Sequence, residues 1–133
     1  MMIKKFLFIF IASFLLNLIW ENAQAPLYLH YQGHIISEYT LLRAALFDAV
    51  LTTAIFLIII KLPAIKNKLA WVMTVCLVSA ISIELYALAT NRWAYNQTMP
   101  IIPGFNVGLS PIIQLPLLAL IVYYLTKNYQ KTK

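Results

Sequence analysis

The chain has 133 residues, of which 62% are hydrophobic and 11% are charged. A soluble domain carries roughly 25% charged residues, so this composition excludes a water-soluble globular protein. The net charge of +6 comes from lysines at the ends of apolar runs, without any phosphate-binding or nucleic-acid-binding motif. The charge therefore indicates membrane topology and argues against a nucleic-acid partner.

Four apolar runs cover residues 6–20, 41–60, 69–90 and 107–126. A membrane-spanning helix needs about 20 residues, and the last three runs fit this length. The first run is short, but Lys4 and Lys5 can snorkel and the helix can continue beyond Trp20. We therefore predict an all-α, four-transmembrane-helix bundle in a single membrane domain over 1–133, with helices at about 4–24, 40–61, 68–91 and 110–127.

The first run also has the pattern of a secretory signal peptide. Lys4 and Lys5 precede an apolar stretch, and residues 23–25 (Ala-Gln-Ala) have the form of a cleavage site. Pro26 would directly follow that cut, and proline disfavours cleavage there. We expect an uncleaved first helix.

Two longer segments, 21–40 and 91–106, connect the spans on one side of the membrane. Residues 26–33 predict a short interfacial helix, with Pro26 in its first turn and Gly33 at its end. Residues 99–105 are mostly apolar, and Pro-Gly at 103–104 suits a type II turn. We expect this second, apolar loop to pack over the mouth of the bundle.

Proline and serine mark the last span. Ser110 and Pro111 predict the N-cap and first position of the fourth helix. Pro116 removes a backbone donor inside that helix and leaves the carbonyl of Ile112 without its bond, which predicts a kink.

The basic residues predict the orientation. All lysines fall before the first span, between the second and third spans, or after the fourth, whereas Arg43 and Arg92 lie toward the other side. By the positive-inside rule the lysine side is cytoplasmic, so both chain ends are predicted to lie in the cytoplasm.

Polar and small side chains recur at three- and four-residue spacings, which places each set on one face of its helix. The sets are Ser13, Asn17 and Glu21; Ala44, Asp48 and Thr52; Ala80, Glu84, Ala87 and Asn91; and Ser110 and Gln114. Asp48 and Glu84 lie about 10 Å from the outer ends of their helices, at 1.5 Å per residue. The helices are therefore predicted to enclose a polar pocket open toward the outside, above a dry inner half.

Buried carboxylates at such a depth need partners, because a charged side chain at mid-membrane costs roughly 2.5–3.5 kcal/mol on the insertion scale. Same-helix spacings do not suit ion pairs here, so the sequence favours cross-helix pairs of Asp48 with Arg92 or of Glu84 with Arg43. Structural hydrogen bonding and a functional role are both open for Asp48 and Glu84. Glu21, Arg92 and Arg43 also have simple interfacial or ion-pair explanations.

Metal and cofactor chemistry receives no support. His30 and His34 are four residues apart, but a third and fourth ligand are not evident, so we expect no metal site. Cys76 lies in an apolar run and is expected to be a small buried hydrophobic side chain. We expect no cofactor.

Two stretches carry a resemblance to known proteins. Residues 17–28 read N-x-x-W-E-x-x-Q-x-P-L-Y, and residues 92–104 read R-W-x-Y-N-x-x-M-P-x-x-P-G. Together they resemble a group of small bacterial four-span membrane proteins. The resemblance implies a bacterial inner-membrane location and does not indicate an activity. The layout, with buried acids and a proline-broken last helix, is also similar to the emopamil-binding-protein superfamily, as an analogy of architecture alone.

The leading functional hypothesis is a pocket that binds a small amphiphilic or lipid-like ligand, with membrane lipid as the surrounding partner. Candidate ligand-binding residues are Asn17, Trp20, Glu21, Arg43, Arg92, Trp93, Tyr95 and Gln114. In a catalytic version, Glu84 and Asp48 act as acid and base, with burial keeping a proton on one of them. The alternatives are a structural or accessory subunit of a membrane complex, in which Asn17 and Gln114 only join helices, and a homo- or hetero-oligomeric transporter component.

Overall fold

The computed structural model describes residues 2–132, most of which belong to four long α-helices. These are α1 (Met2–Gln24), α2 (Glu38–Lys61), α3 (Lys68–Ala89) and α4 (Leu109–Lys131). Each is long and apolar enough to cross a membrane by length and composition. The prediction of a mostly helical, multi-pass membrane protein is therefore confirmed.

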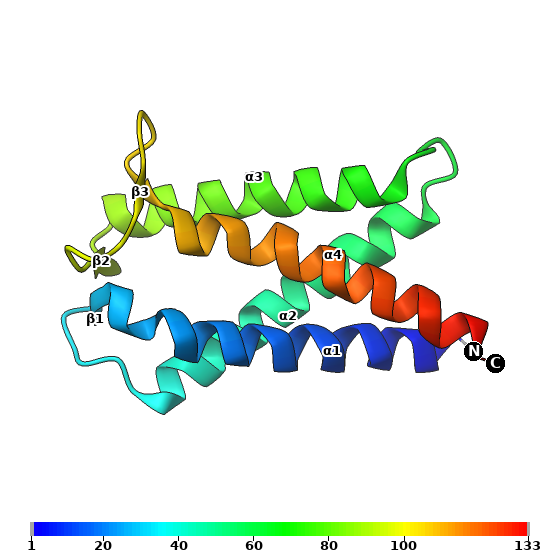
Figure 1. Cartoon of the computed structure of the whole chain (residues 1–133), viewed down its shortest axis with the longest axis horizontal. Helices are drawn as coiled ribbons and strands as arrows, with labels where there is room; N and C mark the ends of the chain where they lie inside the picture. The colour runs from blue at the N-terminus through cyan, green and yellow to red at the C-terminus, as the bar shows by residue number, and fades with distance from the viewer. Residues whose placement is uncertain (1, 133) are drawn as a thin grey trace.

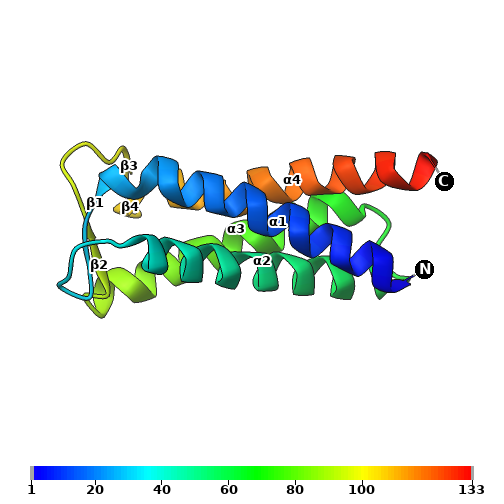
Figure 2. The same ribbon diagram turned by 90° about the horizontal axis from the view of Figure 1, so that it is seen from below.

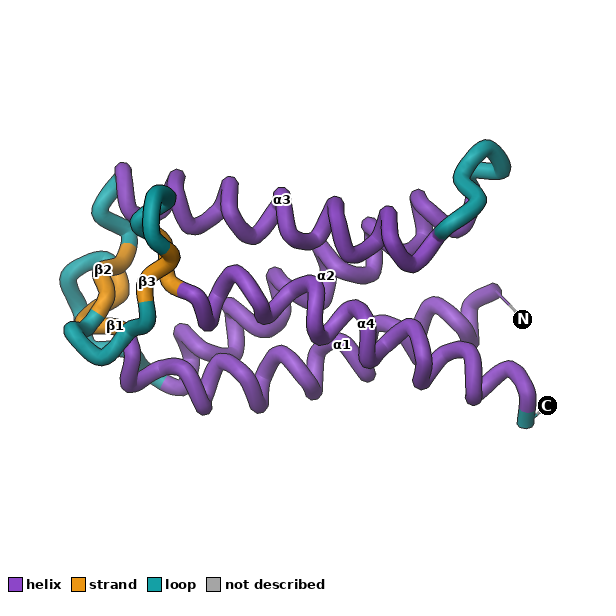
Figure 3. Tube along the Cα trace, turned by 45° about the horizontal axis from the view of Figure 1, so that its top comes forward, coloured by secondary structure: helices purple, strands orange, loops and turns teal. Residues whose placement is uncertain are grey.

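The four helices lie side by side along the long axis of the molecule (Figures 1 and 2). The start of α1, the end of α4 and the α2–α3 connection lie together at one end, here called the terminal end. The segments 25–37 and 90–108 form the other end, here called the loop end, where the strands gather (Figure 3). Helix α2 crosses the bundle obliquely, so that it lies near α3 at the terminal end and diverges from it toward the loop end (Figure 1).

Capping residues define where the two middle helices begin. The side chain of Ser37 accepts a hydrogen bond from the backbone N–H of Thr40 at 3.3 Å, at the start of α2. Asn67 accepts one from the N–H of Ala70 at 3.1 Å, at the start of α3. Each cap satisfies an amide that has no partner inside its own helix.

Helix α4 begins earlier than predicted. Its N-cap is Gly108, so the N-cap assignment to Ser110 is wrong, and the Ser110 hydroxyl instead donates to Gln24 Oε1 of α1 at 2.8 Å. A Cβ at position 108 would lie 2.8 Å from the sulfur of Met99, so any other residue here would require the Met99 side chain to shift. Pro116 lies inside α4, and the kink there stays a prediction.

The interfacial helix predicted for residues 26–33 is wrong. A single 3₁₀ turn, η1 (Ala25–Leu27), is followed by strand β1 (Tyr28–Tyr31). Strand β1 pairs antiparallel with β2 (Trp93–Tyr95), and Tyr31 stacks on Trp93 with ring centroids 6.2 Å apart. Aromatic side chains favour strands, and the partner strand satisfies the backbone groups that a helix would have bonded internally.

The second outer segment folds into a small hairpin. Strands β3 (Ile101–Ile102) and β4 (Val107–Gly108) pair antiparallel, and Gly104 in the connection has φ +90°. That conformation suits glycine and agrees with the predicted turn. Met99 and Val107 are buried, so this apolar segment packs against the helices.

The terminal end is filled by apolar side chains. Fully buried residues there include Ile9 of α1, Phe56 of α2, Val72 of α3 and Val122 of α4. Cys76 is buried beside them, as expected for a small hydrophobic side chain. This half of the bundle is held by close packing.

Candidate functional site

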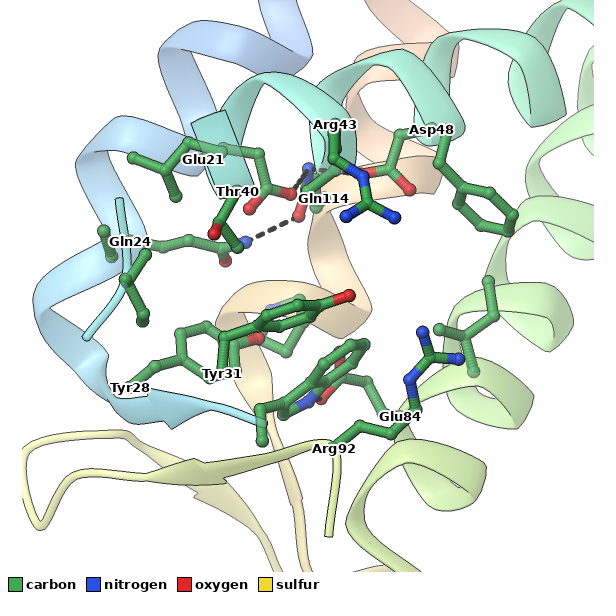
Figure 4. A pocket seen from close by; sticks show the side chains of 18 of the residues that line it. Glu21, Gln24, Tyr28, Tyr31, Thr40, Arg43, Asp48, Glu84, Arg92 and Gln114 are labelled. Carbon is green, nitrogen blue, oxygen red and sulfur yellow. Dashed lines mark hydrogen bonds between the residues drawn. The ribbon is translucent and has the colours of Figure 1, made fainter. Parts of the chain in front are cut away.

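A cavity of about 270 Å³ lies at the loop end, between the helices and below the paired strands β1 and β2. Side chains from all four helices and from both outer segments line it (Figure 4). The lining combines carboxylates, arginines and amides with aromatic and aliphatic groups. The structure thus brings polar residues that are far apart in the sequence into one space.

Seven of the ten predicted site residues line this cavity, namely Glu21, Arg43, Asp48, Glu84, Arg92, Trp93 and Gln114. The other three, Asn17, Trp20 and Tyr95, lie behind it and hydrogen-bond to residues that line it. The lining also includes Gln24, Tyr28, His30, Tyr31 and Thr40, which sequence reasoning did not assign to the site. The roles of all these residues in binding or catalysis stay predictions.

Gln114 of α4 is the centre of the polar contacts. Its side chain is buried, and its Nε2 lies 2.9 Å from Asn17 Oδ1, 2.8 Å from Glu21 Oε1 and 3.0 Å from Asp48 Oδ2. One NH₂ group has two hydrogens, so it cannot donate to all three acceptors at once. Asn17 is itself oriented because its Nδ2 donates to the backbone carbonyl of Ser13 at 2.8 Å.

Gln24 fixes the other side of the Gln114 amide. Gln24 Nε2 donates to Gln114 Oε1 at 2.9 Å. Its own Oε1 accepts from Trp20 Nε1 at 3.1 Å and from Ser110 Oγ at 2.8 Å. An indole N–H can only donate, so the Trp20 contact requires the oxygen of the Gln24 amide to face Trp20. The Nε2 of Gln24 then faces Gln114, which requires the Gln114 amide to present its oxygen to Gln24.

Sequence reasoning missed Gln24, although a signal was present. Asn17, Glu21 and Gln24 follow one another at spacings of four and three residues, which continues the polar face of α1 into its last turn. Position 24 belongs to two sequence patterns, the signal-peptide cleavage pattern and the N-x-x-W-E-x-x-Q motif, and neither pattern assigns it to the site. Its burial and its contacts show that it belongs to the hydrogen-bonded set of residues around Gln114, here called the polar layer (Asn17, Glu21, Gln24, Asp48, Ser110 and Gln114).

Glu84 of α3 is bound by neutral donors from strand β2. Trp93 Nε1 donates to Glu84 Oε2 at 3.1 Å, and the hydroxyl of Tyr95 donates to the same oxygen. Trp93 and Tyr95 are two residues apart in a strand and so lie on the same face. Burial, and then its hydrogen bond to Glu84, raises the pKa of Tyr95.

Tyr28 of β1 extends this aromatic cluster. Its ring lies edge-on to Trp93 and to Tyr95, with centroids 6.3 and 5.5 Å apart respectively. Burial, and then the negative charge of Glu84, raises the pKa of Tyr28. The strand pair therefore supplies a rigid aromatic wall with neutral hydroxyl groups.

The predicted cross-helix ion pairs do not form. Within residues 2–132, neither Arg43 nor Arg92 makes an ion pair with a carboxylate, because Asp48 and Glu84 accept hydrogen bonds from neutral donors instead. The guanidinium of Arg43 lies 5.6 Å from the ring centroid of Tyr39. Amide and aromatic donors satisfy the carboxylates without burying a second charge.

The end of α3 positions Arg92. Asn91 has φ +53°, the left-handed conformation that asparagine tolerates. The N–H of Arg92 donates to the carbonyl of Ala87 at 2.9 Å, and that of Asn91 to Leu88 at 3.3 Å. This pair of bonds is a Schellman motif, which ends the helix and reverses the chain so that Arg92 lines the cavity.

Lining residues that reach the molecular surface lead us to infer that the cavity opens to the side, between α2 and α3. Its lining includes Arg43 and Phe47, which are exposed on α2, and the half-buried Ile83 on α3. These two helices diverge toward the loop end (Figure 1).

The two histidines do not share a ligand geometry. His30 lines the cavity, and its Nδ1 accepts a hydrogen bond from the N–H of Gly33 at 3.0 Å, whereas His34 is exposed in the turn beyond β1. Across residues 2–132, no group of three or more His, Cys, Asp or Glu side chains has a metal-binding arrangement.

No protein-family model, curated protein or solved structure matches this chain.

Proposed function

We propose that this chain is a bacterial inner-membrane protein that binds a small amphiphile, with the polar head of the ligand in the loop-end cavity and its apolar part in the bilayer. The observation that carries the proposal is a polar cavity, lined by all four helices, that opens between two membrane-spanning helices. Polar residues inside a membrane are costly, and their concentration around open space is typical of a binding site.

The size of the cavity supports a head group as its occupant. A volume of about 270 Å³ is slightly below the usual range for pockets that enclose a whole drug-sized ligand. An apolar tail would leave the cavity between Phe47 of α2 and Ile83 of α3, where it meets apolar side chains and lipid. Amphiphilic ligands suit this combination of a polar interior and a lipid-facing opening.

The lysines support an orientation with the cavity in the outer half of the bilayer. Lys4 and Lys5 precede most of α1, and Lys66 lies in the α2–α3 connection, all at the terminal end. By the positive-inside rule that end is cytoplasmic, together with both chain ends. The ligand would then come from the outer leaflet.

A catalytic form of the proposal uses Asp48 and Glu84 as base and acid. Both line the same cavity from different helices, so both can reach one head group. If the protein catalyses a reaction of the amphiphile, Asp48→Asn and Glu84→Gln should each abolish that reaction while the protein still retains the ligand. Unchanged turnover in both variants contradicts this form.

The proposal is tested by filling the cavity. Ala44 lines it from α2, whereas Ala54 on the same helix is exposed away from it. We expect the wild type, purified in a neutral detergent, to retain a bound amphiphile in native mass spectrometry. Ala44→Phe should lose that ligand, and Ala54→Phe, the matched control, should keep it.

Two results would contradict binding in this cavity. Equal retention in Ala44→Phe and Ala54→Phe would mean that amphiphile binds elsewhere on the apolar surface. Absence of any retained amphiphile, together with no rise in melting temperature on adding one, would favour the accessory-subunit hypothesis, in which the polar layer only joins helices.

A further inference from the structure

Within residues 2–132, two arginines face the cavity without a hydrogen-bond or ion-pair partner, although Arg43 also lies beside the Tyr39 ring. Arg43 extends from α2 on one side, Arg92 from the segment after α3 on another, and their guanidinium groups point into the same space (Figure 4). In the part of the chain that the structure describes, neither guanidinium donates a hydrogen bond, and the Nε of Arg92 is buried without a partner. Each guanidinium has five N–H donors, of which the Nε of Arg92 is buried and unsatisfied, and the exposed Arg43 extends its donors toward the same space.

Unsatisfied buried donors are uncommon in folded proteins because each one loses its hydrogen bonds to water. Arg92 is held where it is by its backbone, through the Schellman motif and through the bond from Gln32 N–H to the carbonyl of Arg92. Strand pairing next to it fixes the segment further. The side chain is therefore directed into the cavity by rigid local structure, which favours a partner that is not part of the protein.

The carboxylates of the cavity do not act as that partner. Glu84 accepts hydrogen bonds from Trp93 and Tyr95, and Asp48 accepts one from Gln114. Within residues 2–132, neither guanidinium lies within ion-pairing distance of either carboxylate. The arrangement leaves both guanidinium groups free for an anion.

We propose that the ligand's head group carries a phosphate that bridges Arg43 and Arg92. This inference rests on the proposed function and names the chemical class of its ligand. Planar guanidinium groups bind phosphate oxygens through paired, charge-assisted hydrogen bonds, and two of them on different walls match a group with several acceptor oxygens. Inorganic phosphate has the same binding chemistry as a phosphate head group, so the test compares inorganic phosphate with an alkyl phosphate.

The experiment compares amphiphiles with one alkyl chain and different heads. Dodecyl phosphate, dodecyl glycerol and dodecylammonium are titrated into the protein in a neutral maltoside detergent, and dissociation constants are measured by microscale thermophoresis. We expect dodecyl phosphate to bind at least about tenfold more tightly than the other two. Arg43→Gln and Arg92→Gln should each weaken its binding by at least about tenfold.

Control variants keep the test interpretable. Lys66→Gln removes the same charge from the exposed α2–α3 connection and should leave binding unchanged. Arg92→Lys keeps the charge without the planar fork and should bind at an intermediate strength. If Arg92→Gln does not fold, Arg43→Gln carries the test, because the exposed Arg43 contributes little to packing.

The outcomes distinguish the two proposals. Equal binding of dodecyl phosphate and dodecyl glycerol, unaffected by the arginine variants, overturns the phosphate inference and leaves amphiphile binding intact. Tighter binding of dodecylammonium also overturns it, since the carboxylates would then select the head. If inorganic phosphate binds as tightly as dodecyl phosphate, the result supports phosphate recognition by the arginines and contradicts the proposal that the ligand is an amphiphile.

Discussion

The two ends of the bundle are held together in different ways. At the loop end, side chains of different helices hydrogen-bond to one another, as Gln24 of α1 does to Gln114 of α4. At the terminal end, Thr126 donates to the carbonyl of Val122 in its own helix, and apolar packing around Phe56 fills the interior. The loop end combines directional bonds with open space, whereas the terminal end is dense. We infer that the terminal end provides stability and the loop end provides the binding site.

The largest expected effect on stability comes from the terminal end. Phe56 is 1% exposed, and Phe56→Ala removes a large packed side chain. We expect a loss of about 3 kcal/mol in the free energy of unfolding, measured by titration with sodium dodecyl sulfate in mixed micelles, with little change in amphiphile affinity.

The matched change at the opening should behave in the opposite way. Phe47 is on the same helix, is 57% exposed and lines the cavity. Phe47→Ala should weaken amphiphile binding and leave the free energy of unfolding nearly unchanged. If both variants lose stability to the same degree, the proposed division between the two ends is wrong.

Removal of the central amide is expected to have the next largest effect. Gln114→Leu deletes the group that donates to Glu21 and Asp48 and accepts from Gln24. We expect a loss of about 2 kcal/mol in the free energy of unfolding, because buried polar groups are left without partners. Amphiphile binding should be lost as well.

Gln97→Leu is the control for that variant, because Gln97 is exposed in the second outer segment. It should unfold like the wild type. A Gln114→Leu variant with wild-type stability and binding would show that the polar layer does not organise the site.

The turn after α3 should give a smaller effect. Asn91→Ala places a residue that disfavours positive φ at +53° and should lower stability by about 1 kcal/mol. Asn91→Gly keeps the turn and serves as the matched variant. Amphiphile affinity should fall with alanine and persist with glycine, because the turn positions Arg92. Equal affinity in both variants would show that the conformation of this turn does not affect ligand binding.

The smallest effect concerns the aromatic wall. Burial and Glu84 together raise the pKa of Tyr95, so Glu84→Gln should lower that pKa, although burial, the larger cause, remains. Because the folded state holds the phenolic proton more tightly, this contribution to stability is present below about pH 10 and lost as the pH rises further. Alkaline titration of tyrosinate absorbance measures the change, and Glu38→Gln, at an exposed position, should match the wild type.

The helices were predictable from the sequence because long apolar runs have few alternatives in a membrane. The pairing of β1 with β2 could not be predicted from the sequence, because it joins two segments that are separated by two whole helices. Residues 26–33 satisfied the local rules for a short helix, and the partner strand that changes the outcome is not visible locally.

The site was predictable in part. Helical spacing and depth predicted that Asp48 and Glu84 share one space, and both side chains line the cavity. Their partners were predicted incorrectly, because formal charge favoured Arg43 and Arg92, whereas the packing of α4 and β2 brings Gln114 and Trp93 within reach. Spacing along one helix identifies its polar face, but the choice of donor depends on how the helices pack.

Photoaffinity labelling would test the central claim most directly. An alkyl phosphate with a diazirine in its chain, near the head, is bound to the purified protein, irradiated and mapped by peptide mass spectrometry. Labelling should concentrate on α2 and α3 around Phe47 and Ile83, which border the opening, and Ala44→Phe should abolish it. Labelling spread evenly over the exposed apolar surface of all four helices, or unchanged in Ala44→Phe, would contradict a ligand held in the loop-end cavity.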